Sequence, residues 1–559
     1  MQNKGRLFKL IALAVFTAAT TMACTGTMQT TDTTSAQVIA NDRAPKLVVL
    51  LVVDGLPQRQ ITQYRDQLSP DGFARFLDRG TWFSDAHHEH AFTVTGAGHA
   101  TLLTGAYPER TGIIGNDWLD ANTGQAVYCT SDTSATYIGN PTKPLDGTSP
   151  KNLDAQSLGD VLRLANPKSK VLAVSGKDRG SILPAGKAGT AYMYMTGSGQ
   201  FASSTFYMPA HPDWVNRFNA QKLADAYFKT QWKPLLEDAA YARSLPDKQA
   251  WFDDGVAGLP ITFGKPNDAA PNAAFYAGLV RGPFVDEMTM GFARAAIAGE
   301  QLGQGVATDL LSISLSGHDY VNHGFSAESR LSHDHFLRLD LMLQDFFKHL
   351  DATIGKDNYV AVLTADHGFM PAPEYTKSLG QDAGRIGRSK LLATINSGLE
   401  KRFGEAKLVL GFSGSSLLMD KKLIAAKNID FNAVTLEAKG LLVSQPGIAV
   451  AYTRNELLAG DKGQPLFASL KKSWSPSVSG DVQYAVKPNW MFSSATTGTT
   501  HGSPYAYDSN IPIMWYGPKW VKAGHQTKPI ESVDIAPTLA KIIAIKAPEK
   551  SQGQVLTLR

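Results

Sequence analysis

Cysteine is almost absent from this sequence, which has two among 559 residues. So few thiols exclude a disulfide-stabilised scaffold and a cysteine-rich zinc module. The net charge of +4 is too small to predict nucleic-acid binding. No apolar run of about 18 residues follows the N-terminus, which excludes a protein that crosses a membrane several times. A hydrophobic share of 43% against 19% charged residues excludes a disordered chain. At roughly 150 residues per domain, the length suits about three to four domains or one large domain with insertions.

The N-terminal residues 1–24 predict a secretory signal peptide. Three basic residues precede an apolar run over residues 10–23, which is too short for a comfortable membrane span. The run ends at Cys24 after a small residue, so the segment resembles a bacterial lipoprotein site, and either lipidation there or ordinary cleavage nearby fits it. Residues 25–44 are polar and low in complexity, which predicts a flexible tether. We therefore expect an exported, periplasmic protein that is either free or anchored by a lipid.

Apolar runs that alternate with helical patterns predict the fold class. Leu and Val fill residues 47–53, as is typical of a strand buried on both faces of a parallel sheet. Further candidate strands cover residues 310–315, 359–363 and 511–516. Apolar residues recur at helical spacing over 336–350, and Asp534 is expected to cap a helix that runs to residue 543. This order predicts an α/β fold with a mainly parallel central sheet flanked by helices, which binds ligands beyond the carboxyl ends of its strands.

One catalytic domain is expected over residues 45–559. Two stretches, at about 181–300 and 371–497, fit the alternation of strands and helices poorly. In the first, Gly, Pro and aromatic residues follow no regular period. The second separates two parts of the site described next. We interpret both as insertions that cap or flank the site.

Six residues with metal-binding side chains stand in separated segments, several of them where predicted strands end. They are three aspartates and three histidines: Asp54, Asp319, His323, Asp366, His367 and His501. Taken singly, each has an ordinary alternative as a turn residue or a surface polar group. Taken together, they form two sets of three, which is what two catalytic zinc ions need while each keeps an open position for substrate or water. Imidazole with carboxylate suits Zn(II) better than Mg(II) or Ca(II).

The order and spacing of these residues resemble the alkaline phosphatase superfamily. The similarity is greatest to its single-threonine branch, the periplasmic, phosphate-irrepressible alkaline phosphatases of the PafA type, which are related to nucleotide pyrophosphatase/phosphodiesterases. It extends from about residue 46 to the C-terminus. The resemblance implies two zinc sites with these ligands: Asp319, His323 and His501 for one, and Asp54, Asp366, His367 and Thr95 for the other.

The segment from Thr95 to His99 supplies the expected nucleophile. A hydroxyl group attacks phosphorus at neutral pH only when a base or a metal activates it, and the resemblance places Thr95 on a zinc. The intervening Gly-Ala-Gly lets the backbone approach closely, and a helix N-terminus there favours a phosphate. Thr93 or Thr101 as nucleophile, or Thr95 as a simple helix cap, remain alternatives. His99 is expected to be structural.

Three further residues bear on the choice of substrate. Asn116 follows Thr95 by the spacing of a phosphoryl contact in the family, and Lys177 with Arg179 resembles a Lys-x-Arg pair of its monoesterase branch. A phosphate monoester carries an additional charged oxygen, which Lys and Arg would favour and which a diester lacks. The alternative is that Lys177 and Arg179 form an ordinary charged turn.

Other reactive side chains are expected to be structural. His87, His88 and His90 are expected to support the site or face solvent rather than form a third metal site. His318 is expected to yield the ligand role to its neighbour Asp319, and Cys129 to be a small buried or loop residue.

The residues and the resemblance together predict an alkaline phosphatase with two zinc ions. The resemblance implies that it hydrolyses small-molecule phosphate monoesters through a phosphothreonine intermediate. We expect it to act as a monomer without a nucleic-acid partner. Two alternatives stay open: a phosphodiesterase or nucleotide pyrophosphatase on the same metals, and a non-catalytic lipoprotein on the same scaffold. A sulfatase is excluded because no Cys or Ser stands in the required Cys/Ser-x-Pro-x-Arg context, and export argues against a phosphoglycerate mutase.

Overall fold

A buried central strand organises the computed structural model, which describes residues 44–460 and 463–559. This strand is β1 (Leu47–Val53), and none of its seven residues is accessible to solvent. Residues 44–559 form one compact unit around it. The predicted signal peptide, Cys24 and nearly all of the predicted tether lie outside the described residues.

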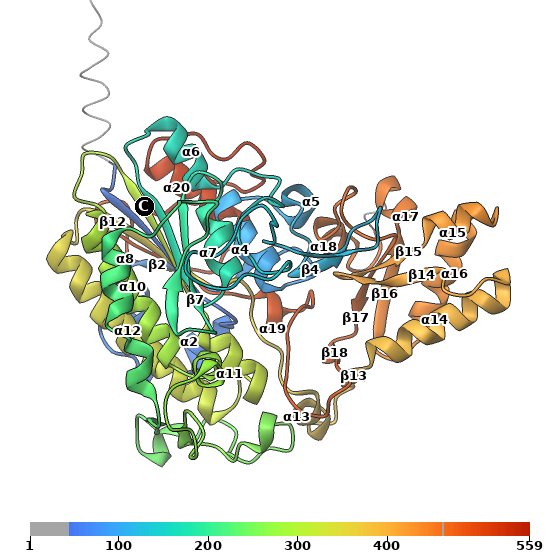
Figure 1. The fold of residues 1–559 in the computed structure, drawn as a ribbon, viewed down its shortest axis with the longest axis horizontal. Helices are drawn as coiled ribbons and strands as arrows, with labels where there is room; N and C mark the ends of the chain where they lie inside the picture. Colours follow the sequence, from blue (N-terminus) through green and yellow to red (C-terminus); the bar gives the residue numbers. More distant parts are fainter. Residues whose placement is uncertain (1–43, 461–462) are drawn as a thin grey trace, which may run out of the picture. The chain divides into compact units, whose positions relative to one another are not determined.

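β1 lies near the middle of a nine-stranded mixed sheet (Figure 1). The order across the sheet is β20 (Gly524–Gln526), β2 (Thr81–Phe83), β19 (Ile513–Tyr516), β12 (Tyr359–Thr364), β1, β11 (Asp309–Leu315), β6 (Val171–Ser175), β7 (Thr190–Met195) and β8 (Gln200–Ala202). β12, β1, β11, β6 and β7 run parallel to their neighbours within this group. The predicted α/β fold with a mainly parallel sheet is confirmed.

The fourth predicted strand differs from the other three in direction. Residues 513–516 form β19, but β19 pairs antiparallel with both β12 and β2. A fully buried strand is a continuous apolar run whether it pairs parallel or antiparallel, so the sequence pattern did not indicate the direction of this strand.

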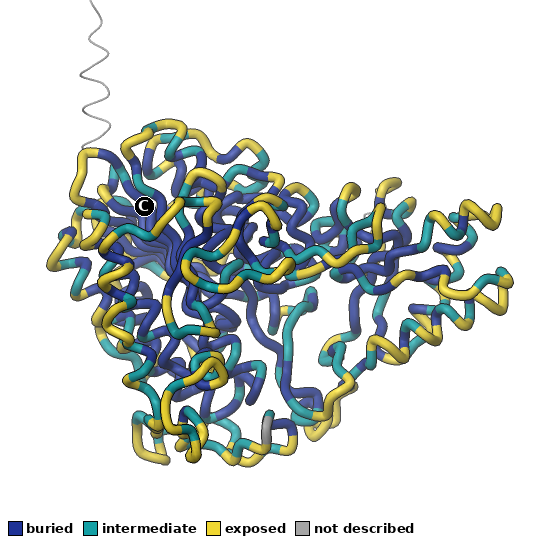
Figure 2. The backbone as a smooth tube through the Cα atoms, viewed as in Figure 1, coloured by how far each residue is buried: buried dark blue, intermediate teal, exposed yellow. Residues whose placement is uncertain are grey.

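Helices flank the sheet on both faces (Figure 1). α7 (Asp178–Ala185) packs on β6, β7 and β11, and α4 (Thr95–Thr104) packs on α7. α10 (Phe284–Glu300) packs on β6 and β11, and the long α12 (Arg330–Thr353) packs on α10 and on α3 (Phe73–Arg79). Figure 2 shows the resulting buried layers around the sheet. The predicted helix over 336–350 is therefore confirmed as part of α12.

The predicted capping role of Asp534 is wrong in detail. Asp534 is the N-cap residue of α20 (Ile535–Ile542), but its side chain makes no capping hydrogen bond to that helix. Its carboxylate instead accepts hydrogen bonds from the backbone N–H groups of Glu531 and Gln554. The side chain thus ties the preceding turn to the C-terminal segment.

The stretch at about 181–300 contributes its ends to the central layers. β7 and β8 extend the main sheet, and α10 covers it, so these parts are not separate from the catalytic fold. Between them lie α8 (Asp213–Ala220), α9 (Ala273–Gly278) and two short paired strands, β9 (Gln231–Trp232) and β10 (Ile261–Thr262).

The stretch at about 371–497 contains a lobe with its own sheet and core. We call residues 384–492 the cap lobe; it begins at β13 (Gly384–Ile386) and ends at β18 (Trp490–Phe492), which pair in parallel. Its sheet has the order β14 (Val409–Ser413), β15 (Ser416–Met419), β17 (Val482–Val486) and β16 (Ile448–Thr453). α14 (Arg388–Phe403) and α16 (Phe431–Val443) pack against this sheet, and their apolar residues form a second core. Figure 1 shows the lobe at the right of the molecule.

The remaining elements are short connectors. They are α2 (Gln58–Gln63), β3 (Ala86–His87), α5 (Pro108–Thr111), β4 (Asp117–Leu119), β5 (Ala126–Tyr128), α6 (Leu158–Ala165), α11 (Gly317–Phe325), α13 (Pro373–Ser378), α15 (Lys421–Ala426), α17 (Arg454–Ala459), α18 (Phe467–Lys472), α19 (Ala506–Ser509) and β21 (Ile530–Glu531). Within the described residues, none of the helices has the length and apolarity needed to span a bilayer.

Candidate active site

Three adjacent strand ends bring the predicted carboxylates together. Asp54 directly follows β1, Asp319 lies in the first turn of α11 after β11, and Asp366 follows β12. β11 and β12 are the two neighbours of β1 and run parallel to it, so their carboxyl ends meet at one edge of the sheet. The pairing of these strands, which the sequence order does not give, creates the site.

The predicted ligands form two overlapping groups. Asp54, Asp366 and His367 make one, and Asp319, His367 and His501 make the other, with the ligand atoms of each group within 4.8 Å of one another. His367 Nε2 lies 3.5 Å from Asp54 Oδ1 and 3.4 Å from Asp366 Oδ2. His367 therefore stands between the two groups.

His323 borders the second group. Its Nε2 lies 3.4 Å from Asp319 Oδ1, and His501 Nε2 lies 3.6 Å from the same oxygen. The two predicted sets of three ligands are thus neighbours in space. His367, from one set, also has its Nε2 4.0 Å from Oδ1 of Asp319, which belongs to the other.

Backbone carbonyls orient all three histidines in the same way. The Nδ1 atoms of His323, His367 and His501 lie 2.8, 2.9 and 2.8 Å from the carbonyl oxygens of Thr499, Gly368 and Thr93, respectively. A carbonyl oxygen only accepts, so each Nδ1 carries the proton and each Nε2 presents a lone pair to the carboxylates. Metal-binding histidines are held in this manner, with the distal nitrogen donating to a carbonyl or carboxylate.

The buried carboxylates have fewer hydrogen-bond donors than their oxygens can accept. Asp54 Oδ1 and Asp319 Oδ1 are buried without a hydrogen bond among the described residues, and Asp54 Oδ2 has only its ion pair with the Lys177 ammonium group. Burial raises the pKa of Asp54 well above its usual value, and the nearby Asp366 carboxylate adds to the effect. Buried carboxylates of this kind are stabilised by cations, so the donor set fits divalent metal ions with oxygen and imidazole ligands.

Lys177 supplies the one ammonium group within this cluster of carboxylates. Its Nζ lies 2.8 Å from Asp54 Oδ2 and 2.5 Å from Asp319 Oδ2, and 4.8 Å from the ring centre of Tyr320. One ammonium against three carboxylates leaves net negative charge in a buried space. Lys177 therefore offsets part of the charge of these carboxylates, and its predicted contact to phosphate stays a prediction.

Thr95 begins α4 and faces the metal-type ligands. Its Oγ1 lies 3.5 Å from His367 Nε2 and accepts a hydrogen bond from Arg179 at 3.5 Å. The two alternative hydroxyls have other partners: Thr93 Oγ1 donates to the Ser503 carbonyl at 2.9 Å, and Thr101 Oγ1 donates to the Ala97 carbonyl within the helix at 2.8 Å. Of these three threonines, Thr95 has the hydroxyl that is placed for chemistry.

Arg179 is held beside Thr95 by residues that sequence reasoning missed. Its guanidinium donates to the Tyr128 hydroxyl at 3.1 Å, and that hydroxyl donates to Asp178 at 2.8 Å. Asn116 Oδ1 accepts from the Gly96 N–H at 2.7 Å, which leaves its amide N–H groups available to a ligand. Arg179 and Asn116 therefore stand on the two sides of the α4 N-terminus, where a phosphate would gain from backbone N–H groups.

The glycine at position 98 has a reason that the sequence did not show. A Cβ there would lie 2.0 Å from the Asp366 carbonyl oxygen, so the close approach is between α4 and the Asp366 backbone. His99 continues this contact: its Nδ1 lies 3.0 Å from the Thr95 carbonyl and 3.1 Å from Asp366 Oδ2, and its Nε2 lies 2.9 Å from Ser314 Oγ. His99 thus joins the predicted nucleophile to a predicted ligand.

We expect Gly98→Ala to move α4 away from Asp366 and to lower both stability and activity. Overpacking of this kind costs about 1–3 kcal/mol of unfolding free energy. Gly291→Ala, within α10, is the matched control: its Cβ would meet nothing closer than 3.9 Å, and it should stabilise by about 0.5–1 kcal/mol. Urea unfolding and phosphatase assays of both variants check this, and a silent Gly98→Ala would contradict the packing argument.

Of the other singled-out histidines, His87, His88 and His318 make hydrogen bonds to side chains. His90 is buried with ring contacts to His88 and Tyr107 and without a hydrogen bond among the described residues. His88 Nδ1 lies 2.8 Å from Ser532 Oγ, and His318 Nε2 lies 2.8 Å from Gln60 Oε1. His87 Nε2 lies 2.9 Å from Asp85. Burial raises the pKa of the Cys129 thiol to about 12, which leaves it without thiolate at neutral pH.

Known proteins resemble this chain over most of its length. Residues 48–504 match the type I phosphodiesterase/nucleotide pyrophosphatase family. The chain is 33% identical over 518 residues to the alkaline phosphatase PafA of Elizabethkingia meningoseptica, covering 92% of this chain and 94% of the relative. It is 35% identical over 527 residues to a Myroides odoratus protein named calcium-transporting ATPase, covering 93% and 96%.

A solved structure shares the fold over almost the whole chain. The crystal structure of wild-type alkaline phosphatase PafA superposes with a TM-score of 0.85 at 31% identity, covering 92% of this chain and 98% of that one. A likeness of this extent includes the sheet, its flanking helices and most of the cap lobe. The chain therefore belongs to the type I phosphodiesterase/nucleotide pyrophosphatase family and, within it, to the branch that contains the PafA-type alkaline phosphatases.

Proposed function

We propose that this protein is an alkaline phosphatase that hydrolyses phosphate monoesters at a two-zinc site, with Thr95 as the nucleophile. The observation that carries the proposal is the position of the Thr95 hydroxyl, between the Arg179 guanidinium and His367 of the two ligand groups. The proposed zinc ligands are Asp319, His323 and His501 for one ion and Asp54, Asp366, His367 and Thr95 for the other. The names of a relative of the chain and of a similar solved structure, both alkaline phosphatase PafA, support phosphate-ester chemistry.

In the proposed mechanism, the chain's residues position the phosphate for in-line attack. Thr95 Oγ1 gives up its proton and bonds to phosphorus as the bond to the leaving oxygen breaks. The leaving oxygen takes up a proton, so the products of this step are an alcohol and a phosphothreonine. Water then loses a proton and bonds to phosphorus while the bond to Thr95 Oγ1 breaks, which regenerates the protonated hydroxyl and releases inorganic phosphate. Metal ions held by the two ligand groups would lower the pKa of a bound hydroxyl and neutralise the developing charge. Arg179 and Asn116 would donate hydrogen bonds to the non-bridging oxygens as their charge grows.

The preference for monoesters rests on Arg179. A monoester presents one more charged oxygen than a diester, and a guanidinium held by Tyr128 beside Thr95 is placed to bind it. The family also contains phosphodiesterases, so a diesterase on the same metals is the competing function.

We expect Arg179→Ala to lower kcat/KM for p-nitrophenyl phosphate by about 10²–10³-fold, the effect of losing one preorganised donor at a transition state. Its effect on methyl p-nitrophenyl phosphate should be below about tenfold, because that substrate lacks the additional charged oxygen. The exposed Arg217→Ala is the control. A wild type that prefers the diester, or equal losses on both esters, would favour the diesterase.

Export completes the proposal. The basic and apolar segments of residues 1–24 support export to the periplasm, with Cys24 as a candidate lipid anchor. We propose that the exported protein acts as a monomer. Mass spectrometry of the mature N-terminus would separate lipidation from simple cleavage.

A further inference from the structure

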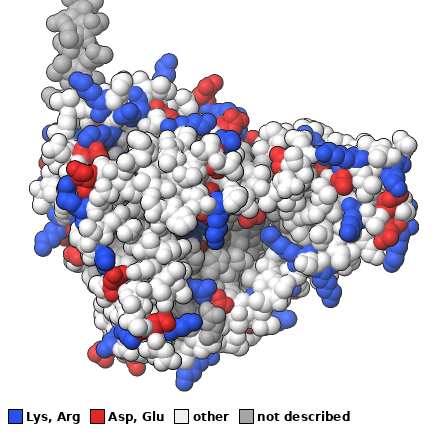
Figure 3. Space-filling model, in the orientation of Figure 1, with Lys and Arg blue, Asp and Glu red and all other residues white. Residues whose placement is uncertain are grey.

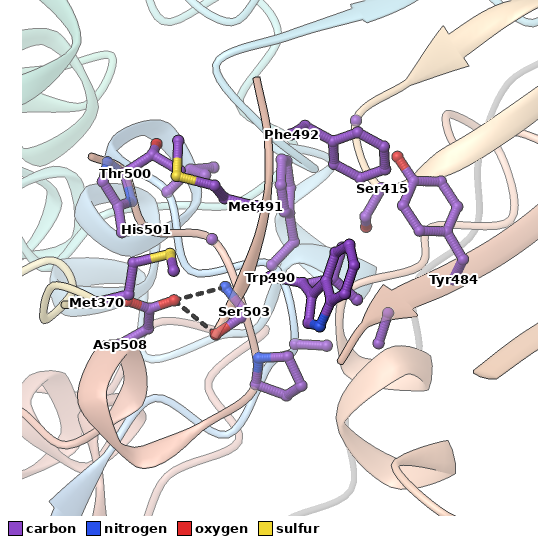
Figure 4. A pocket seen from close by; sticks show the side chains of 18 of the residues that line it. Met370, Ser415, Tyr484, Trp490, Met491, Phe492, Thr500, His501, Ser503 and Asp508 are labelled. Carbon is purple, nitrogen blue, oxygen red and sulfur yellow. Dashed lines mark hydrogen bonds between the residues drawn. The ribbon is translucent and has the colours of Figure 1, made fainter. Parts of the chain in front are cut away.

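A cavity joins the candidate active site to the cap lobe. It has a volume of about 230 Å³ and is lined on one side by Asn116, His323 and His501. On the other side it is lined by cap-lobe residues, among them Tyr484, Trp490 and Phe492 (Figure 4). Figure 3 shows the surface hollowed between the main part of the molecule and this lobe. The volume is below the roughly 300–1,000 Å³ of sites for drug-sized ligands, so it suits one small ring system.

The cap-lobe wall of the cavity is aromatic. Tyr484 and Phe492 are 5.6 Å apart between ring centres, and Trp490 lies two residues before Phe492 in β18, on the same face of the strand. Met370 and Met491 add thioether sulfur to the lining, which favours contacts with aromatic ligands. Such a wall offers flat, polarisable surface together with the Trp490 indole N–H, which makes no hydrogen bond to the described residues.

The charge of the cavity disfavours a second anionic group. Asp117 and Asp508 line it, against one cationic side chain, Arg388. The Arg388 guanidinium lies 5.1 Å from the ring centre of Phe492, where it stacks on the aromatic wall. Burial raises the pKa of Asp508 to about 7, so at neutral pH Asp117 and a partly ionised Asp508 face one guanidinium. These three side chains leave no surplus of positive charge for a leaving group that carries another phosphate.

The active-site side of the cavity is fixed in place. Asp508 accepts hydrogen bonds from the backbone N–H and the hydroxyl of Ser503, at 2.9 and 2.6 Å (Figure 4). This anchors the loop that carries His501, whose Nδ1 also bonds to the Thr93 carbonyl. In-line attack sends the leaving oxygen to the side opposite Thr95. We assign that side to Asp319, His323 and His501, the proposed ligand set that does not contain Thr95, and two of these three line the cavity.

We propose that this cavity is the subsite for the leaving group and that it selects phosphate monoesters of aromatic or heteroaromatic compounds, such as nucleoside 5′-monophosphates, over small sugar or alkyl phosphates. The inference rests on the proposed phosphatase function. Trp490 and Phe492 are the specificity-determining residues, because they form the part of the wall that a bound ring would face.

The test compares two substrates, one with and one without an aromatic base. Adenosine 5′-monophosphate and ribose 5-phosphate are both esters of a primary alcohol, so their chemical reactivity is matched. Trp490→Leu and Phe492→Leu, in the full-length metal-loaded protein, should lower kcat/KM for the nucleotide by about 3- to 10-fold, the value of one aromatic contact. The value for ribose 5-phosphate should change less than twofold. Phe403→Leu, in the same lobe but outside the cavity, is the control.

Equilibrium binding separates this inference from the proposed function. Calorimetry with the Thr95→Ala protein should give a Kd for the nucleotide about 3- to 10-fold below that for ribose 5-phosphate, and Phe492→Leu should remove the difference. Absence of turnover with retained discrimination would contradict the phosphatase proposal alone. Equal Kd values, or equal losses on both substrates, would overturn the subsite. A third result would also overturn the subsite: Arg388→Gln loses turnover of adenosine 5′-diphosphate selectively, while Trp490→Leu and Phe492→Leu have no effect. The cavity would then select its ligand by charge.

Discussion

Thr95→Ala is expected to lower kcat/KM for p-nitrophenyl phosphate by at least about 10³-fold, since no other hydroxyl can replace the attacking oxygen. Thr95 Oγ1 is the threonine hydroxyl that faces both Arg179 and His367. The methyl group of alanine fits wherever the threonine Cβ substituents fit, so α4 should keep its place. Steady-state kinetics measure the loss, and elemental analysis checks that the metal content is unchanged.

Two further threonine variants make this result specific. Thr95→Ser keeps a hydroxyl and should retain measurable turnover. Thr101→Ala removes a hydroxyl that bonds only within its own helix, so it should cost less than about tenfold. If Thr95→Ala kept a tenth of the wild-type rate while Thr101→Ala lost more, the nucleophile would be misassigned.

Removal of divalent metal is expected to abolish activity and to lower the unfolding temperature. Asp54, Asp319 and Asp366 are fully or almost fully buried at one place, and the Lys177 ammonium group pairs with only the first two. Without cations their mutual repulsion and desolvation oppose the folded state. A ligand present at about 100–1,000 times its Kd stabilises the folded state by about 2.7–4.1 kcal/mol, which chelation would remove.

The measurement is activity and melting temperature after dialysis against a chelator, followed by addition of Zn(II), Mg(II) or Ca(II). We expect Zn(II) to restore both, because the ligands combine imidazole with carboxylate. Asp54→Asn should lower the bound metal, whereas Asp430→Asn, at an exposed helix cap, should not. Full activity in chelated protein would contradict the two-metal proposal, and bound metal without turnover of any ester would favour the non-catalytic scaffold.

The strand and ligand patterns could be predicted because they depend on local chemistry. A run such as Leu47–Val53 has no polar residue to face solvent, so it must be buried on both faces wherever it lies. Asp54 and Asp366 follow such strands directly, and Asp319 follows β11 within one turn. Three aspartates and three histidines, several of them near strand ends, therefore indicated a metal site before any geometry was known.

Other features depend on partners that are distant in the sequence. The antiparallel direction of β19 is set by its neighbours β12 and β2. The contribution of β7 and β8 to the main sheet is likewise a matter of pairing, and an irregular amino-acid pattern hid it. The contacts of Lys177 are a further example, because its ammonium group lies against Asp54 and Asp319, which are 123 and 142 residues away in the sequence.

The sequence by itself determined which side chains are available: a threonine before a helix, six metal-type ligands and a Lys-x-Arg pair. Only the tertiary structure decided how they meet, because a site is made by strands that lie side by side, and order along the chain does not specify this. It placed β1 between β11 and β12, turned each His Nε2 toward the carboxylates through a backbone carbonyl, and set the Tyr128 hydroxyl under Arg179. It also closed an aromatic wall of the cap lobe over the same edge of the sheet.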